Sequence, residues 1–250
     1  MQTELISGEP HGAINGDSIC RVPGDCASCS LRPIALCGQD AEERVEEVTA
    51  LRQPHRQVAA RRVIFHEGDR LKEIYQLYDG WAFRYKVLKD GRRQILSVLL
   101  PGDCVNMPVM FADHINYSVK TLTPVSFCVF NASQFFHFIS ASPLTTKRAG
   151  LYCANVQAQA EELILDLGCR SAYDRVGRLI AGIVSRLRVR GVVGPIFPLP
   201  LTQLHIADAT GLTPVHIGRI LGEMRHAKLL DVKRGYLTLH DPDWLLRVAR

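Results

Sequence analysis

The sequence has no segment suited to crossing a membrane or to directing secretion. Residues 1–16 contain no apolar core of a signal peptide, and no later run is both long and free of charge. It also contains no glycine-rich nucleotide-binding loop and no paired nucleophile and base, so we predict that it is not an enzyme. With 47% hydrophobic and 22% charged residues it has a globular composition, and we expect a cytoplasmic protein without membrane contact.

Acidic residues are scarce in one strongly basic segment. Residues 170–190 carry six arginines, and Asp174 is their single acidic neighbour in that segment. Such a stripe can meet phosphate, but a charge run is usually a solvated helix face. On charge alone we predict a solvated face.

Residues 61–130 consist of short β-type runs separated by turn signals. Asp90-Gly91 is a hairpin signal because this pair tolerates a positive φ. Many short strands at even spacing favour an antiparallel roll or barrel. The predicted strands are 63–65, 74–78, 81–88, 94–100 and 117–130.

Helices are predicted before and after the strand region. Residues 41–51 form a short acidic helix, and Ser142-Pro143 opens a longer one that ends near residue 167. Apolar residues recur at every seventh position of the longer helix, as in a coiled-coil seam, so it packs on its own roll or on a second copy. A basic helix over 171–190 and a loop over 191–200 follow. The recurring residues are Leu144, Leu151, Ala158 and Leu165.

The C-terminal region has the pattern of a helix-turn-helix. Thr202 caps a helix over 203–209, Gly211 supplies the turn, and Thr213 caps a second helix over 215–226. The small or apolar residues that this unit needs at its crossing and inner face are Ala207, Ile217 and Ile220. Strands over 229–232 and 236–239, joined by the basic tip Lys233-Arg234-Gly235, predict a wing.

This order of parts resembles the Crp/Fnr superfamily of bacterial transcription regulators, from about Glu47 to the C-terminus. The resemblance implies an α+β fold: a jelly roll like those that bind cyclic nucleotides, a long dimerisation helix and a winged helix-turn-helix. We expect a Cys-rich arm over 1–45, a sensor roll over 46–141, the dimerisation helix over 142–169 and a DNA-binding domain over 170–250. The resemblance also implies a homodimer on palindromic double-stranded DNA, with RNA polymerase as a further partner.

The resemblance also assigns roles in DNA binding. Arg219 stands at the position of the family's base-reading arginine, which contacts guanine O6 and N7. Val215 replaces the glutamate that reads a base in the best-known members, so His216 is considered for a different contact. The positions that usually touch phosphate are Thr202, Gln203 and Thr213.

Members that bind cyclic nucleotides carry a Gly-Glu-Leu segment followed by an arginine that holds the phosphate. Residues 104–122 contain neither feature. We therefore expect no cyclic nucleotide in this roll.

The N-terminal arm carries closely spaced cysteines, Cys26-x2-Cys29-x7-Cys37. Three thiolates in one loop can wrap a soft metal centre. The arm resembles that of oxygen-sensing Fnr-type proteins, which implies a [4Fe-4S] cluster with Cys128 as fourth ligand, ahead of Cys104. Zinc, with Cys20 completing a local site, or no metal at all is the alternative, in which case heme, nitric oxide or thiol oxidation is the signal.

In the Fnr-type mechanism, an intact cluster favours the dimer that binds DNA, and oxygen destroys the cluster. Ala160 stands where those proteins hold an acidic brake on the dimer helix, so dimerisation here need not depend on oxygen. An iron–sulfur redox protein is a weaker alternative.

Overall fold

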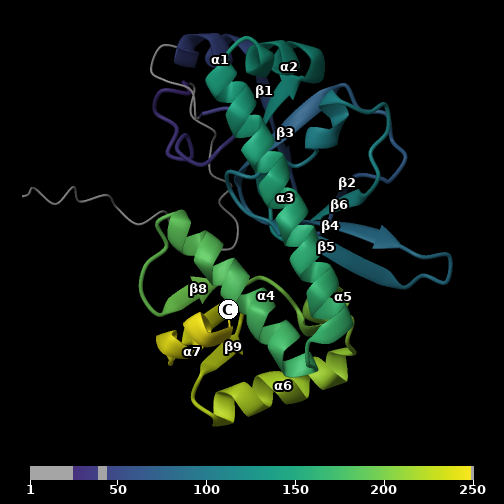
Figure 1. Ribbon diagram of the computed structural model, residues 1–250, viewed down its shortest axis with the longest axis vertical. Helices are drawn as coiled ribbons and strands as arrows, with labels where there is room; N and C mark the ends of the chain where they lie inside the picture. Colours follow the sequence, from purple (N-terminus) through teal and green to yellow (C-terminus); the bar gives the residue numbers. More distant parts are fainter. Residues whose placement is uncertain (1–24, 39–43, 249–250) are drawn as a thin grey trace, which may run out of the picture.

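The structure is a computed structural model that describes residues 25–38 and 44–248, so Cys20 lies outside the described residues. It has the expected α+β architecture, with a β-roll, a long helix and a smaller helical region in chain order (Figure 1). No helix in the described ranges is long and apolar enough to span a membrane.

The roll consists of two antiparallel sheets with strand orders β1-β7-β3 and β2-β6-β4-β5. The helix α1 (Val45–Leu51) precedes it, and the 3-10 helix η2 (Met107–Met110) and α2 (Ala132–Ser140) decorate it. The strands are β1 (Arg52–Val58), β2 (Val63–Phe65), β3 (Glu73–Asp79), β4 (Ala82–Val87), β5 (Arg93–Leu99), β6 (Ser118–Thr121) and β7 (Val125–Asn131). The predicted strands are confirmed, and the strand material predicted over 117–130 forms two strands, β6 and β7.

A single long helix leaves the roll. The helix α3 (Pro143–Cys169) begins at Ser142, whose hydroxyl accepts a hydrogen bond from the Thr145 N–H at 3.4 Å. It runs diagonally past the roll toward the C-terminal region (Figure 1). The predicted apolar row is exposed along its whole length: Leu144, Leu151, Ala158 and Leu165.

The C-terminal region is a winged helix-turn-helix. The helix α4 (Ala172–Val189) leads into α5 (Gln203–Thr210) and α6 (Pro214–His226), followed by α7 (Pro242–Val248). A sheet of order β8-β10-β9 forms the wing, from β8 (Ile196–Pro198), β9 (Leu230–Lys233) and β10 (Tyr236–Leu239). The predicted helices and wing are confirmed, but the predicted loop over 191–200 contains β8, which pairs with β10.

One hydrophobic core joins the roll to the helix-turn-helix. Phe83 of β4 and Val98 of β5 belong to the same buried cluster as Val184 of α4 and Ile206 of α5. Burial of this apolar surface stabilises one relative placement of the two regions. The roll therefore packs directly on α4 and α5.

Candidate DNA-binding surface and cysteine cluster

The helix-turn-helix geometry follows from a few local signals. The side chains of Thr202 and Thr213 each accept a hydrogen bond from the N–H three residues on, at 3.2 and 3.3 Å. Gly211 ends α5 with φ 67°, a left-handed conformation that favours glycine. The predicted crossing and inner-face residues Ala207 and Ile217 are buried. These caps and contacts fix α6 relative to α5.

The helix α6 presents the predicted recognition residues to solvent. Val215 is 85% exposed and the Arg219 side chain 71% exposed, whereas His216 is half-buried. Gln203 of α5 is exposed, and its carboxamide lies against the backbone of Gly218. The structure therefore exposes Val215 and Arg219 on α6 and places Gln203 of α5 against the same helix, with Thr202 and Thr213 also exposed.

The wing tip is basic and tightly turned. Arg234 and Gly235 have φ values of 51° and 80°, and the Lys233 side chain is 70% exposed. Lysine and arginine at such a tip suit contacts with phosphate.

The predicted cluster ligands converge although they come from distant parts of the chain. Cys26 of the arm and Cys128 of β7 are buried in the same hydrophobic cluster, and Cys37 packs against that cluster. The Arg52 guanidinium lies 3.9 Å from the Cys26 sulfur and also hydrogen-bonds to Cys128. Cys104 is fully buried in the same cluster.

The thiol pKa values reflect this crowding. Burial raises the pKa of Cys128 to about 12, opposed by the nearby positive charge of Arg52. Burial also raises the pKa of Cys37 well above its usual value, and the neighbouring thiols add to the rise. Cys29 has a raised pKa for the same reasons, with Cys26 among its neighbours. A soft cation would replace these protons, because metal binding releases the protons of its ligands.

The donor set suits a soft metal centre in number and chemistry, with four thiols in an apolar setting. Across residues 25–38 and 44–248, however, no group of three or more histidine, cysteine or acidic side chains is arranged to hold a metal ion. The arm thiols would have to close on Cys128 to coordinate one.

The basic segment 170–190 is not a solvated face, so that prediction is wrong. Asp103, in the turn after β5, forms ion pairs with Arg186 of α4 and with Arg190, the residue that caps the end of α4, the second at 2.7 Å. Arg170 and Arg178 pair with acidic residues of α3, where Arg178 and Asp166 are 3.0 Å apart. These arginines are therefore structural links between α4, α3 and the roll.

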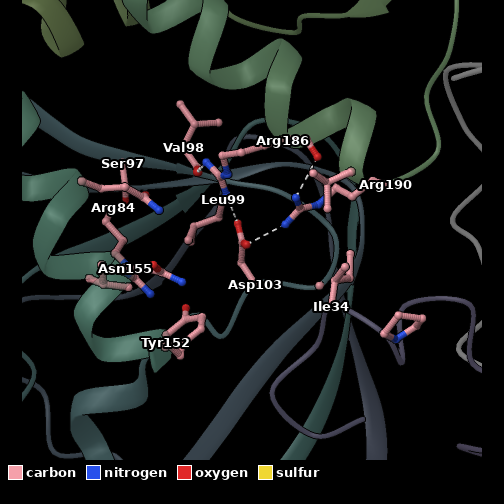
Figure 2. Close-up of a pocket in the computed structure, with 15 residues that line it drawn as sticks. Ile34, Arg84, Ser97, Val98, Leu99, Asp103, Tyr152, Asn155, Arg186 and Arg190 are labelled. Carbon is pink, nitrogen blue, oxygen red and sulfur yellow. Dashed lines mark hydrogen bonds and ion pairs between the residues drawn. The ribbon is translucent and has the colours of Figure 1, made fainter. Parts of the chain in front are cut away.

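Figure 2 shows the link around Asp103, at a cavity of about 280 Å³ between the arm, the roll, α3 and α4. Arg186 and Arg190 also donate to the carbonyls of Val98 and Pro101, at 2.7 and 2.5 Å. We call the contacts of these two arginines with residues 98–103 the Asp103 clasp.

Ile34, between Cys29 and Cys37 in sequence, lines the same cavity and packs against Gly102, where an added Cβ would lie 2.8 Å from its side chain. The cysteine arm thus touches the turn that carries the Asp103 clasp. Sequence reasoning missed this connection because its partners are more than 60 residues apart.

Two family descriptions match the chain: a cyclic nucleotide-binding domain over residues 55–142 and a Crp-like helix-turn-helix domain over residues 174–248. The nitrogen fixation regulation protein FixK of Bradyrhizobium diazoefficiens is 30% identical over 243 residues, which cover 97% of this chain and 96% of FixK. The chain belongs to the Crp/Fnr family of transcription regulators.

Further relatives of this Crp/Fnr protein agree. The transcriptional activatory protein AadR of Rhodopseudomonas palustris is 31% identical over 215 residues, covering 86% of this chain and 88% of AadR. The structure of FixK2 from Bradyrhizobium japonicum superposes with a TM-score of 0.70 at 22% identity, covering 79% of this chain and 97% of that one. The roll of this Crp/Fnr chain thus has the cyclic nucleotide-binding fold, and its helix-turn-helix is of the DNA-binding type.

Proposed function

We propose that this Crp/Fnr regulator is a homodimer that binds palindromic double-stranded DNA and senses oxygen through a [4Fe-4S] cluster. Cys26, Cys29, Cys37 and Cys128 would hold the cluster. The observation that carries the sensing proposal is that Cys26, Cys37 and Cys128 meet at one hydrophobic cluster, with Cys29 near Cys26.

The apolar setting supports an iron–sulfur centre for a physical reason. Thiolates in a low-dielectric site are costly without a cation, and burial accordingly raises the pKa values of Cys29, Cys37 and Cys128. A cluster would supply that cation, with Cys26, Cys29 and Cys37 of the arm and Cys128 of β7 as the residues that would hold it. Arg52 adds a positive charge beside Cys128, which opposes the rise in the pKa of this thiol.

Dimerisation is proposed through α3. The helix contacts its own roll along one face, where the Tyr152 hydroxyl donates to the Cys104 carbonyl at 2.9 Å. The apolar row lies exposed on another face, so a second copy is its proposed partner. Two α3 helices would place two α6 helices for successive half-sites of a palindrome. We further propose the domain division given above, with α3 as dimerisation helix.

DNA contacts are proposed from the exposed side of the helix-turn-helix. Arg219 would read guanine, and Thr202, Gln203 and Thr213 would contact phosphate. The two threonine hydroxyls accept a capping hydrogen bond, which leaves each O–H free to donate to a phosphate oxygen. Because AadR is named a transcriptional activatory protein, we also propose activation, with RNA polymerase as partner.

A gel-shift assay on sites selected from random DNA tests the DNA-binding part. The full-length protein should bind a palindrome with strong salt dependence, because phosphate contacts release counterions. Arg219→Ala should lower the preference for guanine over a mismatched base at that position by about 1–3 kcal/mol while leaving folding intact. Unchanged discrimination would refute the role of Arg219.

The sensing part is tested by iron and sulfide assay after anaerobic purification. About four iron and four sulfide per protomer are expected for one cluster. Stoichiometric zinc without sulfide would remove the oxygen sensor and leave a DNA-binding regulator with a structural metal.

A further inference from the structure

One face of α6 carries two large exposed side chains, Val215 and Arg219, with glycines beside them. Val215, Gly218, Arg219 and Gly222 follow the spacing of one helical face. An added Cβ at Gly222 would meet nothing within 4 Å, so packing inside the chain does not require glycine there. Glycine in a helix interior is destabilising relative to alanine, and at position 222 it leaves room beside Arg219 for an external partner.

Val215 does not serve the fold. It is 85% exposed, buries nothing against the chain and, as a β-branched residue, is a weaker helix former than alanine. Its methyl groups cannot donate or accept a hydrogen bond. In the major groove, the apolar group that base edges offer is the C5-methyl of thymine, which pairs with small apolar side chains.

We propose that Val215 makes the chain select thymine at one position of each half-site, by packing on the C5-methyl group. Arg219 lies one helical turn further on the same face, so the thymine lies near the guanine that Arg219 reads. This inference rests on the proposed DNA binding. His216, half-buried beside Val215, is not assigned a base.

Deoxyuridine gives a direct test, because it differs from thymidine only in lacking that methyl group. Full-length protein, purified anaerobically, is titrated with its selected palindrome and with versions in which each thymine in turn is replaced symmetrically by deoxyuridine. We expect that one thymine in each half-site is sensitive to the replacement. Its loss of the methyl group should weaken binding about fourfold per half-site, the effect of losing one buried methyl contact. All other thymines should tolerate the change.

The variant Val215→Ala should bind the unmodified site more weakly and lose its sensitivity to deoxyuridine at that position. Val215→Glu should change the preferred base pair there, because a carboxylate accepts from cytosine N4. Val193→Ala is the matched control, since Val193 is 82% exposed but lies outside the helix-turn-helix, and it should retain the wild-type pattern.

Equal binding of every deoxyuridine site by the wild type, or undiminished sensitivity in Val215→Ala, would overturn the assignment to Val215. Absence of binding to any DNA would instead overturn the proposed function on which it rests.

Discussion

At the scale of single residues, two buried cysteines of the roll compete for one role. Cys104 and Cys128 belong to the same hydrophobic cluster, and the thiol of each has a pKa raised by burial, to about 11 and about 12. Arg52 contacts Cys128 and Cys26. Among the neighbouring thiols, Cys128 contributes most to the raised pKa of Cys37. Cys128 is therefore the cysteine that faces the arm.

We expect Cys128→Ala to abolish cluster binding and Cys104→Ala to retain it. The measurement is iron and sulfide per protomer in anaerobically purified protein, with the visible absorption of the cluster as a second readout. Both variants remove a buried thiol from the same hydrophobic cluster, so each controls for the packing loss of the other. The reverse pattern, with loss only in Cys104→Ala, would contradict the ligand set.

At the scale of elements, α3 shows what periodicity can predict. We expect Leu151→Glu, at a residue 54% exposed on the apolar row, to convert the dimer to a monomer, because a buried unpaired charge at the seam is costly. Sedimentation velocity measures the outcome. Leu88→Glu is the matched control, since Leu88 is 59% exposed in the hairpin between β4 and β5. A dimer in both variants would exclude the α3 seam as the interface.

A second element-scale prediction concerns the start of α5. The Thr202 N–H donates to Nδ1 of His205, and the His205 ring packs on Phe83 of the roll, 5.4 Å between centroids. Burial, followed by the nearby Arg93, lowers the pKa of His205 below its usual 6.5. The folded state thus favours the neutral ring, so stability is retained above pH 6.5 and lost as the pH falls through the lowered value.

Urea unfolding at pH 7.5 and pH 5.5 measures this dependence. His205→Gln keeps a side-chain acceptor for the cap and cannot titrate, so its loss of stability between the two pH values should be smaller than that of the wild type. An equal loss in both proteins would exclude His205 as a contributor.

Local signals predicted most of these elements, and the exceptions have physical reasons. The strand β1 (Arg52–Val58) has little apolar patterning and contains Pro54, and it is held as an edge strand by its pairing with β7 across a register shift. The recognition face was predictable because caps and turns depend on neighbours in sequence. The partners of the basic segment were not, because Asp103 meets Arg186 only after the roll and α4 have packed.

At the scale of the whole molecule, the Asp103 clasp connects the roll to α4, which leads into the helix-turn-helix. Asp103 precedes Cys104, and the adjacent Gly102 contacts Ile34 of the cysteine arm. Movement of the arm on gain or loss of a cluster would act on this turn and through it on α4. The dimer helix would then not be the single route from the roll to the DNA.

Asp103→Asn tests the strength of this connection. It removes the charge shared by Arg186 and Arg190, whose side chains are 27% and 11% exposed, and should lower the free energy of unfolding by about 1.5–3 kcal/mol. Hydrogen exchange should accelerate in the C-terminal half of α4. Asp90→Asn, in an exposed ion pair with Arg92, should have a much smaller effect because solvent screens this pair. Equal effects of both changes would mean that the clasp contributes no more than a surface pair.

The central claim is that the [4Fe-4S] cluster proposed for the cysteines controls DNA binding. The most direct test is to measure DNA affinity in one sample before and after the cluster is lost. Anaerobically purified protein is titrated with its selected palindrome, exposed to air until the iron–sulfur absorption is lost, and titrated again. We predict tight binding before exposure and binding weaker by at least about tenfold afterwards, a typical size of coupling between two sites. Equal affinity before and after complete loss of the cluster would contradict the account.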